Sequence, residues 1–266
     1  MAADQGMNQS VEKAAAVLAT FLDGRGDLRV SDVAQRAGVG QSTASRLLAT
    51  LEQLEYVERD EISSLYRLGP AVISLAGAAV NQHPVHREAR HHAQSLACSL
   101  GLGANVAVRR GASLFYLCNF EGNLAPKSYS LLGQRNPLHA TGIGKCLLLG
   151  LTPEQRRELL PELPRYTQHT LITHDQLDAE LTQVAERGYS VEREELALGR
   201  ACVSAPVLDG TGSVTAAISI SGPLSAIDLP NREEELGRKA IEVADSISIG
   251  LGYIGPSHPV SAGTGR

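Results

Sequence analysis

Residues 31–59 read SDVAQRAGVGQSTASRLLATLEQLEYVER, and they decide the fold of the N-terminal part of the chain. Ser31 is suited to cap a short helix over residues 32–37, Gly38 ends that helix, and a second helix follows the turn. Apolar side chains recur on one face of this second helix at about 100° per residue, namely Ala44, Leu47, Leu48, Leu51 and Leu54. Two helices joined by a tight glycine turn predict a helix-turn-helix.

The outer face of the second helix carries small polar groups and one arginine. Small side chains let a helix enter the major groove closely, and Arg46 can reach a phosphate or a guanine edge. The pattern therefore predicts DNA binding. The predicted DNA contacts from the two helices are Arg36, Gln41, Ser42, Thr43, Ser45 and Arg46.

Flanking segments complete a winged domain. Ser10 is predicted to cap a first helix that Gly24 and Gly26 end, with a short extended piece at 28–30. The apolar positions of this helix are Val11, Ala14, Val17, Leu18, Phe21 and Leu22. Residues 56–59 and 65–68 read as two strands of a hairpin, with Arg59 and Arg67 available to the DNA backbone.

Charge leaves a second interpretation open. The chain has a formal charge of -5, and residues 10–68 hold seven basic against nine acidic side chains. DNA binding then requires the acids to lie mostly on the first helix, the end of the second helix of the motif, and the wing tip. The alternatives are a small helical bundle with solvated serines, or a domain that contacts protein instead of DNA.

A connecting region follows. The apolar segment 70–80 is shorter than the ~18 residues of a membrane span, and Pro84 separates it from a helix over 85–100. Its histidines (His83, His86, His91 and His92) lack the spacing of a metal site, so we expect neither metal nor cofactor. The four cysteines of this 266-residue chain show no CxxC spacing. With no leader-like start, these features predict reduced thiols and a cytoplasmic location.

From Asn105 onward the pattern changes to helices mixed with antiparallel hairpins. A hairpin is expected over 105–120, and helices over 141–149, 153–160 and 174–187, the last with a capping box at Thr173 and a stop at Gly188. Strands 202–208 and 213–221 follow. This mixture favours an α/β domain with an antiparallel sheet over a parallel dinucleotide fold.

The last hairpin predicts a cavity wall. A four-residue loop at 209–212 would pair Leu208 with Ser213, which sets Cys202 opposite Ser219 and Ser204 opposite Ala217. One face is then small and polar: Cys202, Ser204, Ala217, Ser219 and Ser221. Such a face suits a small-ligand pocket, and the alternative is a solvated or helix-covered sheet face.

The stretch HATGIGKCLLLG at 139–150 resembles a phosphate loop or a thiol site only superficially. Lys145 is followed by cysteine, not serine or threonine, and Cys146 sits in an apolar run typical of a buried cysteine. We therefore expect no enzyme activity. Thr141 is suited to cap a helix whose first N–H groups can donate to an anion, with Gly142 permitting close approach.

Both halves resemble the isocitrate lyase regulator (IclR) family of bacterial transcription factors. SVEKAAAVLATF, VSDVAQRAGVGQSTASRLLATLEQLEYVER and YRLG are similar to its winged helix; GQRNPLHATGIGKCLLLG and GYSVEREELALGRACVSAPVLDGTGSVTAAISISGP are similar to its effector-binding domain. The resemblance runs from about Ser10 to Tyr253. It departs at Glu55, where relatives usually have glycine, and at Glu192, where some acid-binding relatives have aspartate.

The resemblance implies an α/β multidomain fold, an N-terminal winged helix-turn-helix plus a C-terminal GAF-like α/β effector-binding domain with an antiparallel sheet. Its expected parts are tails at 1–9 and 254–266, the winged domain at 10–69, a linker helix at 70–84 and the effector domain at 85–253. It implies a homodimer or tetramer on a palindromic operator in double-stranded DNA, controlled by a small organic or aromatic carboxylate. The implied effector contacts are Gly142, Ile143, Glu192, Cys202, Ser219 and Ser221.

Overall fold

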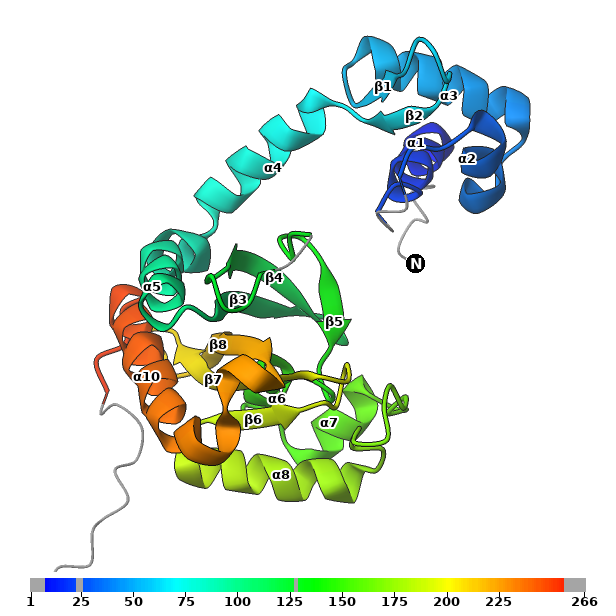
Figure 1. The fold of residues 1–266 in the computed structure, drawn as a ribbon. Coiled ribbons are helices and arrows are strands. Elements are labelled where there is room, and N and C mark those ends of the chain that lie inside the picture. Colours follow the sequence, from blue (N-terminus) through cyan, green and yellow to red (C-terminus); the bar gives the residue numbers. More distant parts are fainter. Residues whose placement is uncertain (1–7, 23–25, 127–128, 256–266) are drawn as a thin grey trace, which may run out of the picture. The chain divides into compact units, whose positions relative to one another are not determined.

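The computed structural model describes residues 8–22, 26–126 and 129–255. The chain divides into two compact units, residues 1–80 and 81–266 (Figure 1). Most of each predicted tail, and Gly24 as the predicted helix stop, lie outside the described residues.

The N-terminal unit is a helix-turn-helix with a wing, as predicted. Its elements are α1 (Gln9–Ala19), α2 (Val30–Ala37), α3 (Gln41–Gln53), β1 (Val57–Arg59) and β2 (Tyr66–Leu68). The two wing strands pair antiparallel, and Leu28 adds one bridge to Tyr66. Val17, Val33 and Leu48 are fully buried between the helices. The apolar faces read from the sequence therefore form one core, except at Leu54, which was predicted on the inner face and is 56% exposed.

Two helix starts differ from the prediction. Asn8, not Ser10, caps α1, and its side chain accepts the N–H of Ser10 at 3.0 Å. At α2 the cap is Arg29, whose own N–H donates to Asp32 at 3.2 Å, so Ser31 lies inside the helix. A carboxylate at the third helical position accepts the N–H of the capping residue itself, which is one half of a capping box.

Helix α1 ends at Ala19, earlier than the glycines predicted. Leu22 therefore lies beyond the helix and is 78% exposed, and Val11 in the first turn, which the periodicity also placed in the core, is 65% exposed.

The turn from α3 into the wing has a left-handed residue. Glu55 has φ 59, a conformation that favours glycine, which accounts for the glycine expected there in relatives. The turn is retained because the Tyr56 N–H donates to the Leu51 carbonyl at 2.9 Å and Gly69 lies directly against the Glu55 carbonyl, where a Cβ would be 2.3 Å away.

Helix α4 (Pro70–Gln82) and helix α5 (Pro84–Leu100) follow, with a break at His83 as predicted. Pro84 occupies the first turn of α5, where its missing N–H costs nothing, and Gly101 closes the helix at φ 68. Within the described residues, no helix combines the length and hydropathy that crossing a bilayer needs.

The C-terminal unit is built on one six-stranded antiparallel sheet in the order β5-β4-β3-β8-β7-β6 (Figure 1). Its strands are β3 (Gly103–Arg110), β4 (Ser113–Phe120), β5 (Arg135–Pro137), β6 (Ser190–Arg193), β7 (Arg200–Leu208) and β8 (Val214–Pro223). β3 pairs with β8 at the centre, so the first and last hairpins of the unit lie side by side.

Helices cover both faces of this sheet. They are α6 (Gly142–Leu148), α7 (Pro153–Leu159), α8 (His174–Arg187), α9 (Leu224–Ile227) and α10 (Leu229–Gly250). α5 and α10 pack on one face over Val203, Ile218 and Ile220. α6 and α8 pack on the other, over Ala107 and Ala217. The capping box at Thr173 and the left-handed stop at Gly188 are confirmed for α8.

The register of the last hairpin was predicted wrongly by two residues. Cys202 lies opposite Ser221 and Ser204 opposite Ser219. Leu208 pairs with Val214, one residue beyond the predicted Ser213, and a bulge at Val207/Leu208 shifts the remaining pairs by one more. A shift of two preserves the face on which each side chain lies. The polar face and the core face are therefore as predicted, although the individual partners are not.

Candidate functional site

The exposed surface of α3 carries the first group of predicted site residues. Gln41, Ser42, Ser45 and Arg46 are exposed, Thr43 is half-buried, and Ala44 and Leu48 hold the opposite face in the core. Residues 41–51 of α3 contain no acidic side chain, and the acid of its last turn is Glu52. The N-terminal half of this helix is thus a polar surface with one positive charge, Arg46.

The other three predicted arginines are engaged inside the domain. The Arg36 guanidinium donates to the Thr20 carbonyl at 3.3 Å. Arg59 lies over the Tyr66 ring, 5.8 Å from its centre. Arg67 pairs with Glu58 across the wing at 3.1 Å. These contacts orient the three guanidinium groups and use part of their capacity to bind DNA. Arg46, in contrast, has no side-chain partner among the residues that the structure describes.

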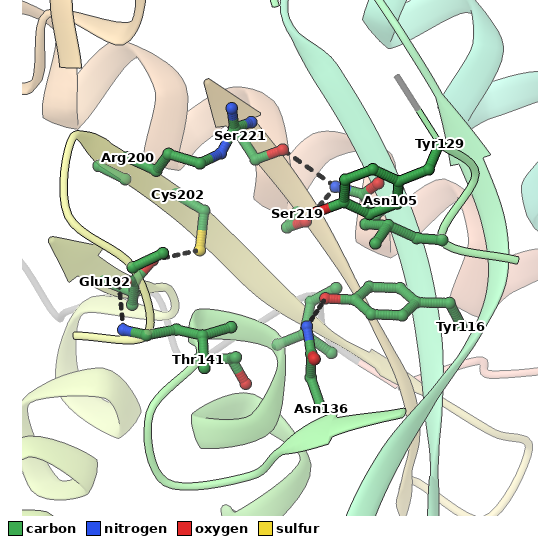
Figure 2. A pocket seen from close by; sticks show the side chains of 15 residues that line it. Asn105, Tyr116, Tyr129, Asn136, Thr141, Glu192, Arg200, Cys202, Ser219 and Ser221 are labelled. Carbon is green, nitrogen blue, oxygen red and sulfur yellow. Dashed lines mark hydrogen bonds between the residues drawn. The ribbon is translucent and has the colours of Figure 1, made fainter. Parts of the chain in front are cut away.

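The second group of site residues surrounds a cavity of about 140 Å³ between α6 and the sheet (Figure 2). It is lined by Asn105, Tyr116, Tyr129, Leu131, Asn136, Thr141, Ile143, Glu192, Leu196, Ala197, Arg200, Ala201, Cys202, Ser219 and Ser221. Five of the six predicted effector contacts, all but Gly142, are among them.

Strand register explains why polar side chains gather here. Side chains directly opposite each other on paired strands share a face. One row across the sheet joins Ser190, Ser204, Ser219, Asn105 and Asn119, and the next joins Glu192, Cys202 and Ser221. Both rows face α6, so the cavity has a polar floor inside an otherwise apolar layer.

A chain of side-chain amides orients the serines on this floor. The Leu131 N–H donates to Asn119 Oδ1 at 3.0 Å, so the Asn119 Nδ2 must be the atom that donates to Asn105 Oδ1, at 2.8 Å. Asn105 Nδ2 in turn donates to the hydroxyls of Ser219 and Ser221, at 3.2 and 3.0 Å (Figure 2). Both serine oxygens are acceptors, so each hydroxyl hydrogen is left to donate elsewhere.

Tyr116 on β4 supplies a third hydroxyl to the cavity. Its oxygen accepts from Asn136 Nδ2 at 3.2 Å, so its hydrogen is also left to donate (Figure 2). Burial raises the pKa of Tyr116 to about 12, which keeps the phenol protonated at neutral pH.

Glu192 and Cys202 form the side of the cavity near β6. Glu192 Oε1 accepts the N–H of Glu195 at 2.6 Å, and Oε2 lies 3.6 Å from the Cys202 sulfur. Burial raises the pKa of the Glu192 carboxyl and also that of the Cys202 thiol, which the Glu192 charge raises further. Cys202 is therefore a neutral thiol in contact with a carboxyl, not a nucleophile.

Gly142 has a different role from the one predicted. A Cβ at this position would lie 2.6 Å from Ser204 Oγ and 2.9 Å from Cys202 Sγ. The glycine is required for close packing of α6 on β7, behind the cavity wall, and the neighbours Thr141 and Ile143 line the cavity instead. The Thr141 hydroxyl caps α6 as predicted, because it accepts the Gly144 N–H at 3.1 Å.

The thiol and histidine of HATGIGKCLLLG are structural. Cys146 is fully buried against Ser190 and the Ser204 carbonyl, and burial raises its pKa to about 11. The His139 ring contacts the Pro164 carbonyl at 3.0 Å. In the described part of the chain, three or more His, Cys, Asp or Glu side chains nowhere converge on a possible metal position.

Known proteins match both units. A family model described as the IclR helix-turn-helix domain matches residues 10–61, and one described as the bacterial transcriptional regulator IclR C-terminal matches residues 77–249. The HTH-type transcriptional regulator XynR of Escherichia coli is 31% identical over 250 residues, covering 92% of this chain and 98% of XynR. The repressor AllR of the same organism is 32% identical over 253 residues, covering 94% and 92%.

The chain belongs to the IclR family.

Solved structures agree with this assignment. A regulator from Rhodococcus sp. RHA1 superposes with a TM-score of 0.82 at 27% identity, covering 92% of this chain and 98% of that one. An IclR homologue from Microbacterium hydrocarbonoxydans, solved with 4-hydroxybenzoate, has a TM-score of 0.80 at 25% identity, covering 91% and 99%. The IclR relatives matched are transcriptional regulators, so the chain is a regulator with a DNA-binding helix-turn-helix, not an enzyme.

Several cavity residues of this IclR protein were missed from the sequence: Asn105, Tyr116, Tyr129, Asn136 and Arg200. Arg200 was within reach of the alternation argument, because it lies two residues before Cys202 and therefore on the same face of β7. Asn105 was not, because nothing local shows that β3 lies beside β8.

Proposed function

We propose that this protein binds a palindromic operator as a homodimer, or as a pair of dimers, and that a small carboxylate bound between α6 and β7–β8 changes its operator affinity. The observation that carries the proposal is the presence in one IclR chain of a recognition helix with Arg46 exposed and a cavity with hydroxyl donors. The 4-hydroxybenzoate complex of the Microbacterium homologue supports ligand binding in this family. The activity belongs in the cytoplasm, where bacterial DNA lies.

An uncovered apolar surface supports a dimer. None of the residues of α4 is buried, and Ile73 and Leu75 are 75% and 55% exposed. Within the N-terminal unit, α4 and α1 form an apolar groove lined by Ala15, Leu18, Ala19, Leu22, Tyr56, Leu68, Val72, Leu75, Ala76 and Ala79. A two-fold operator needs two copies of α3, and a second copy covering this groove would place them in pairs.

Gel-shift titration with the DNA upstream of the protein's own gene tests the DNA half. Arg46→Ala is expected to weaken sequence-specific binding about 10-fold or more, because a good arginine contact contributes about 1–3 kcal/mol. If Arg46 contacts phosphate, the salt dependence should also become shallower by about one counterion.

The matched control is Arg238→Ala on α10, which removes the same charge from a site 70% exposed in the other unit. It should bind DNA like the wild type. Equal loss in both variants, or no specific shift at all, would instead favour an N-terminal domain that contacts protein.

A further inference from the structure

Arg200 lies at the start of β7 with its side chain on the cavity face. It is opposite Pro223, two pairs along from Cys202 and Ser221 and so on the same face, and it lines the cavity. Figure 2 shows its guanidinium reaching past Cys202 toward the Ser221 side of the cavity, away from Glu192.

This guanidinium lacks the partner that other half-buried arginines of the unit have. Arg156 pairs with Asp178 at 2.8 Å, and Arg187 pairs with Glu180 at 2.9 Å. The Nη2 of Arg200 is buried without a hydrogen bond to any described residue. A buried charged donor without an acceptor is costly in free energy. A ligand that supplies an acceptor to this guanidinium would therefore be stabilised by it.

The surroundings of Arg200 specify an anion. The oxygens of Ser219 and Ser221 accept from Asn105, and no described residue accepts the hydrogen of either hydroxyl, so both are available to donate to a ligand. An arginine fork with two hydroxyl donors matches a carboxylate, which accepts at two oxygens. Glu192 does not compete, since no ion pair joins it to Arg200 among the described residues and its Oε1 is occupied by backbone N–H groups.

The size and polarity of the cavity restrict which carboxylic acids can be the effector. The cavity, about 140 Å³, is smaller than the ~300–1,000 Å³ of drug-sized ligand sites. Tyr116 offers a donor on the β4 side of the cavity and Glu192 Oε2 is a polar group on the β6 side, so hydroxyl groups of a ligand can pair with either of them. A plain hydrocarbon body would leave these groups unpaired.

We propose that Arg200 anchors the effector carboxylate, with Ser219 and Ser221, and that the effector is a short aliphatic acid carrying one or more hydroxyl groups. This assignment rests on the proposed effector site but not on DNA binding. It places the anion at the sheet, whereas the sequence had suggested the start of α6.

Isothermal titration of the full chain with three matched probes tests the class. Glycerate should bind, and both propionate, which lacks the hydroxyls, and glyceramide, which lacks the charge, should bind at least about 10-fold more weakly. 4-Hydroxybenzoate tests the size limit. Tighter binding of 4-hydroxybenzoate or propionate than of glycerate, or no binding of any probe, overturns the hydroxy-acid assignment.

Arg200→Gln tests the anchor. Glycerate affinity should fall about 10- to 100-fold, since one charge-assisted contact is lost. The control, Arg193→Gln, removes an exposed arginine from β6 on the opposite face and should bind glycerate like the wild type. Circular dichroism of both variants checks that the fold is retained.

DNA binding separates the two proposals. If the Arg200→Gln variant binds glycerate like the wild type, Arg200 is not the anchor, and the proposal of operator binding is unaffected. If glycerate binding depends on Arg200 but the protein gives no specific gel shift, the proposed control of an operator is wrong, and the role of Arg200 as the anchor is retained.

Discussion

The structural roles of several single residues in this protein cannot be inferred from their chemical type alone. Gly142 looked like a residue that opens a helix end to an anion, but its missing side chain makes room for Ser204 and Cys202. Glu55, by contrast, occupies a left-handed position in spite of its side chain. In both cases the backbone and its neighbours decide what the residue does.

Gly142→Ala should therefore destabilise the protein, by about 1–3 kcal/mol, because the added methyl overpacks a fully buried contact. The better helix propensity of alanine, worth up to about 1 kcal/mol, opposes this effect but is smaller. The measurement is the free energy of unfolding by urea denaturation.

Gly77→Ala in α4 is the matched control, because a Cβ there meets nothing within 4 Å. It should leave stability unchanged or raise it. If Gly142→Ala is equally harmless, β7 yields to the methyl group and the packing argument is wrong.

At the scale of elements, a buried ion pair joins α6 to the turn after β6. Lys145 is 1% exposed, and its ammonium contacts Glu195 at 2.5 Å and the Val191 carbonyl at 3.0 Å. The Glu195 N–H in turn donates to Glu192 in the cavity wall. The Lys145–Glu195 pair thus helps to position Glu192 in the cavity wall. Burial of an ionised Glu195 carboxylate is costly in free energy.

Burial raises the pKa of Glu195 to about 7, although Lys145 beside it acts in the opposite direction. The folded state then holds a proton that the unfolded state releases above its ordinary pKa of 4.5. Stability from this group is full below that value and is lost as the pH rises toward 7.

Urea titrations at about pH 5 and about pH 8 should show a larger fall in stability for the wild type than for Glu195→Gln, by roughly 1–3 kcal/mol. Glu234→Gln, an exposed carboxyl on α10, should retain the wild-type fall. Parallel pH profiles for wild type and Glu195→Gln would show that Glu195 is ionised across the whole range.

At the scale of the molecule, the uncovered apolar surface of α1 and α4 is the part of the chain that the proposed dimer would cover. An apolar helix without one buried residue is uncommon in a monomer, because apolar area left in water costs about 25 cal/mol per Å². A second copy is the occupant that the proposed two-fold operator would also require.

Leu75→Glu should shift the protein toward monomer and weaken operator binding, because a charge would be buried in the proposed interface. Sedimentation velocity over a concentration series measures the change. Ser74→Glu, exposed on the opposite side of α4, should sediment like the wild type. A wild type that is already monomeric at all concentrations would contradict the dimer.

Much of this organisation was predictable from the sequence. The helix-turn-helix, the wing, the break at Pro84 and the polar face of β7–β8 follow from local periodicity, capping and turn residues, which depend on neighbours a few positions away. A two-residue error in the hairpin register did not matter, because side chains alternate with period two.

Only the tertiary structure decided the cavity itself. Asn105 reaches Ser219 and Ser221 because β3 pairs with β8, a contact between residues 114 and 116 positions apart that no local pattern encodes. Gly142 and Arg200 likewise take their roles from what lies across from them: Ser204 and Cys202 against the glycine, and no described acceptor beside the guanidinium. The sequence by itself determined the elements and their faces, since these are set by local geometry; which faces meet, and which charge is left without a partner, was decided by long-range packing.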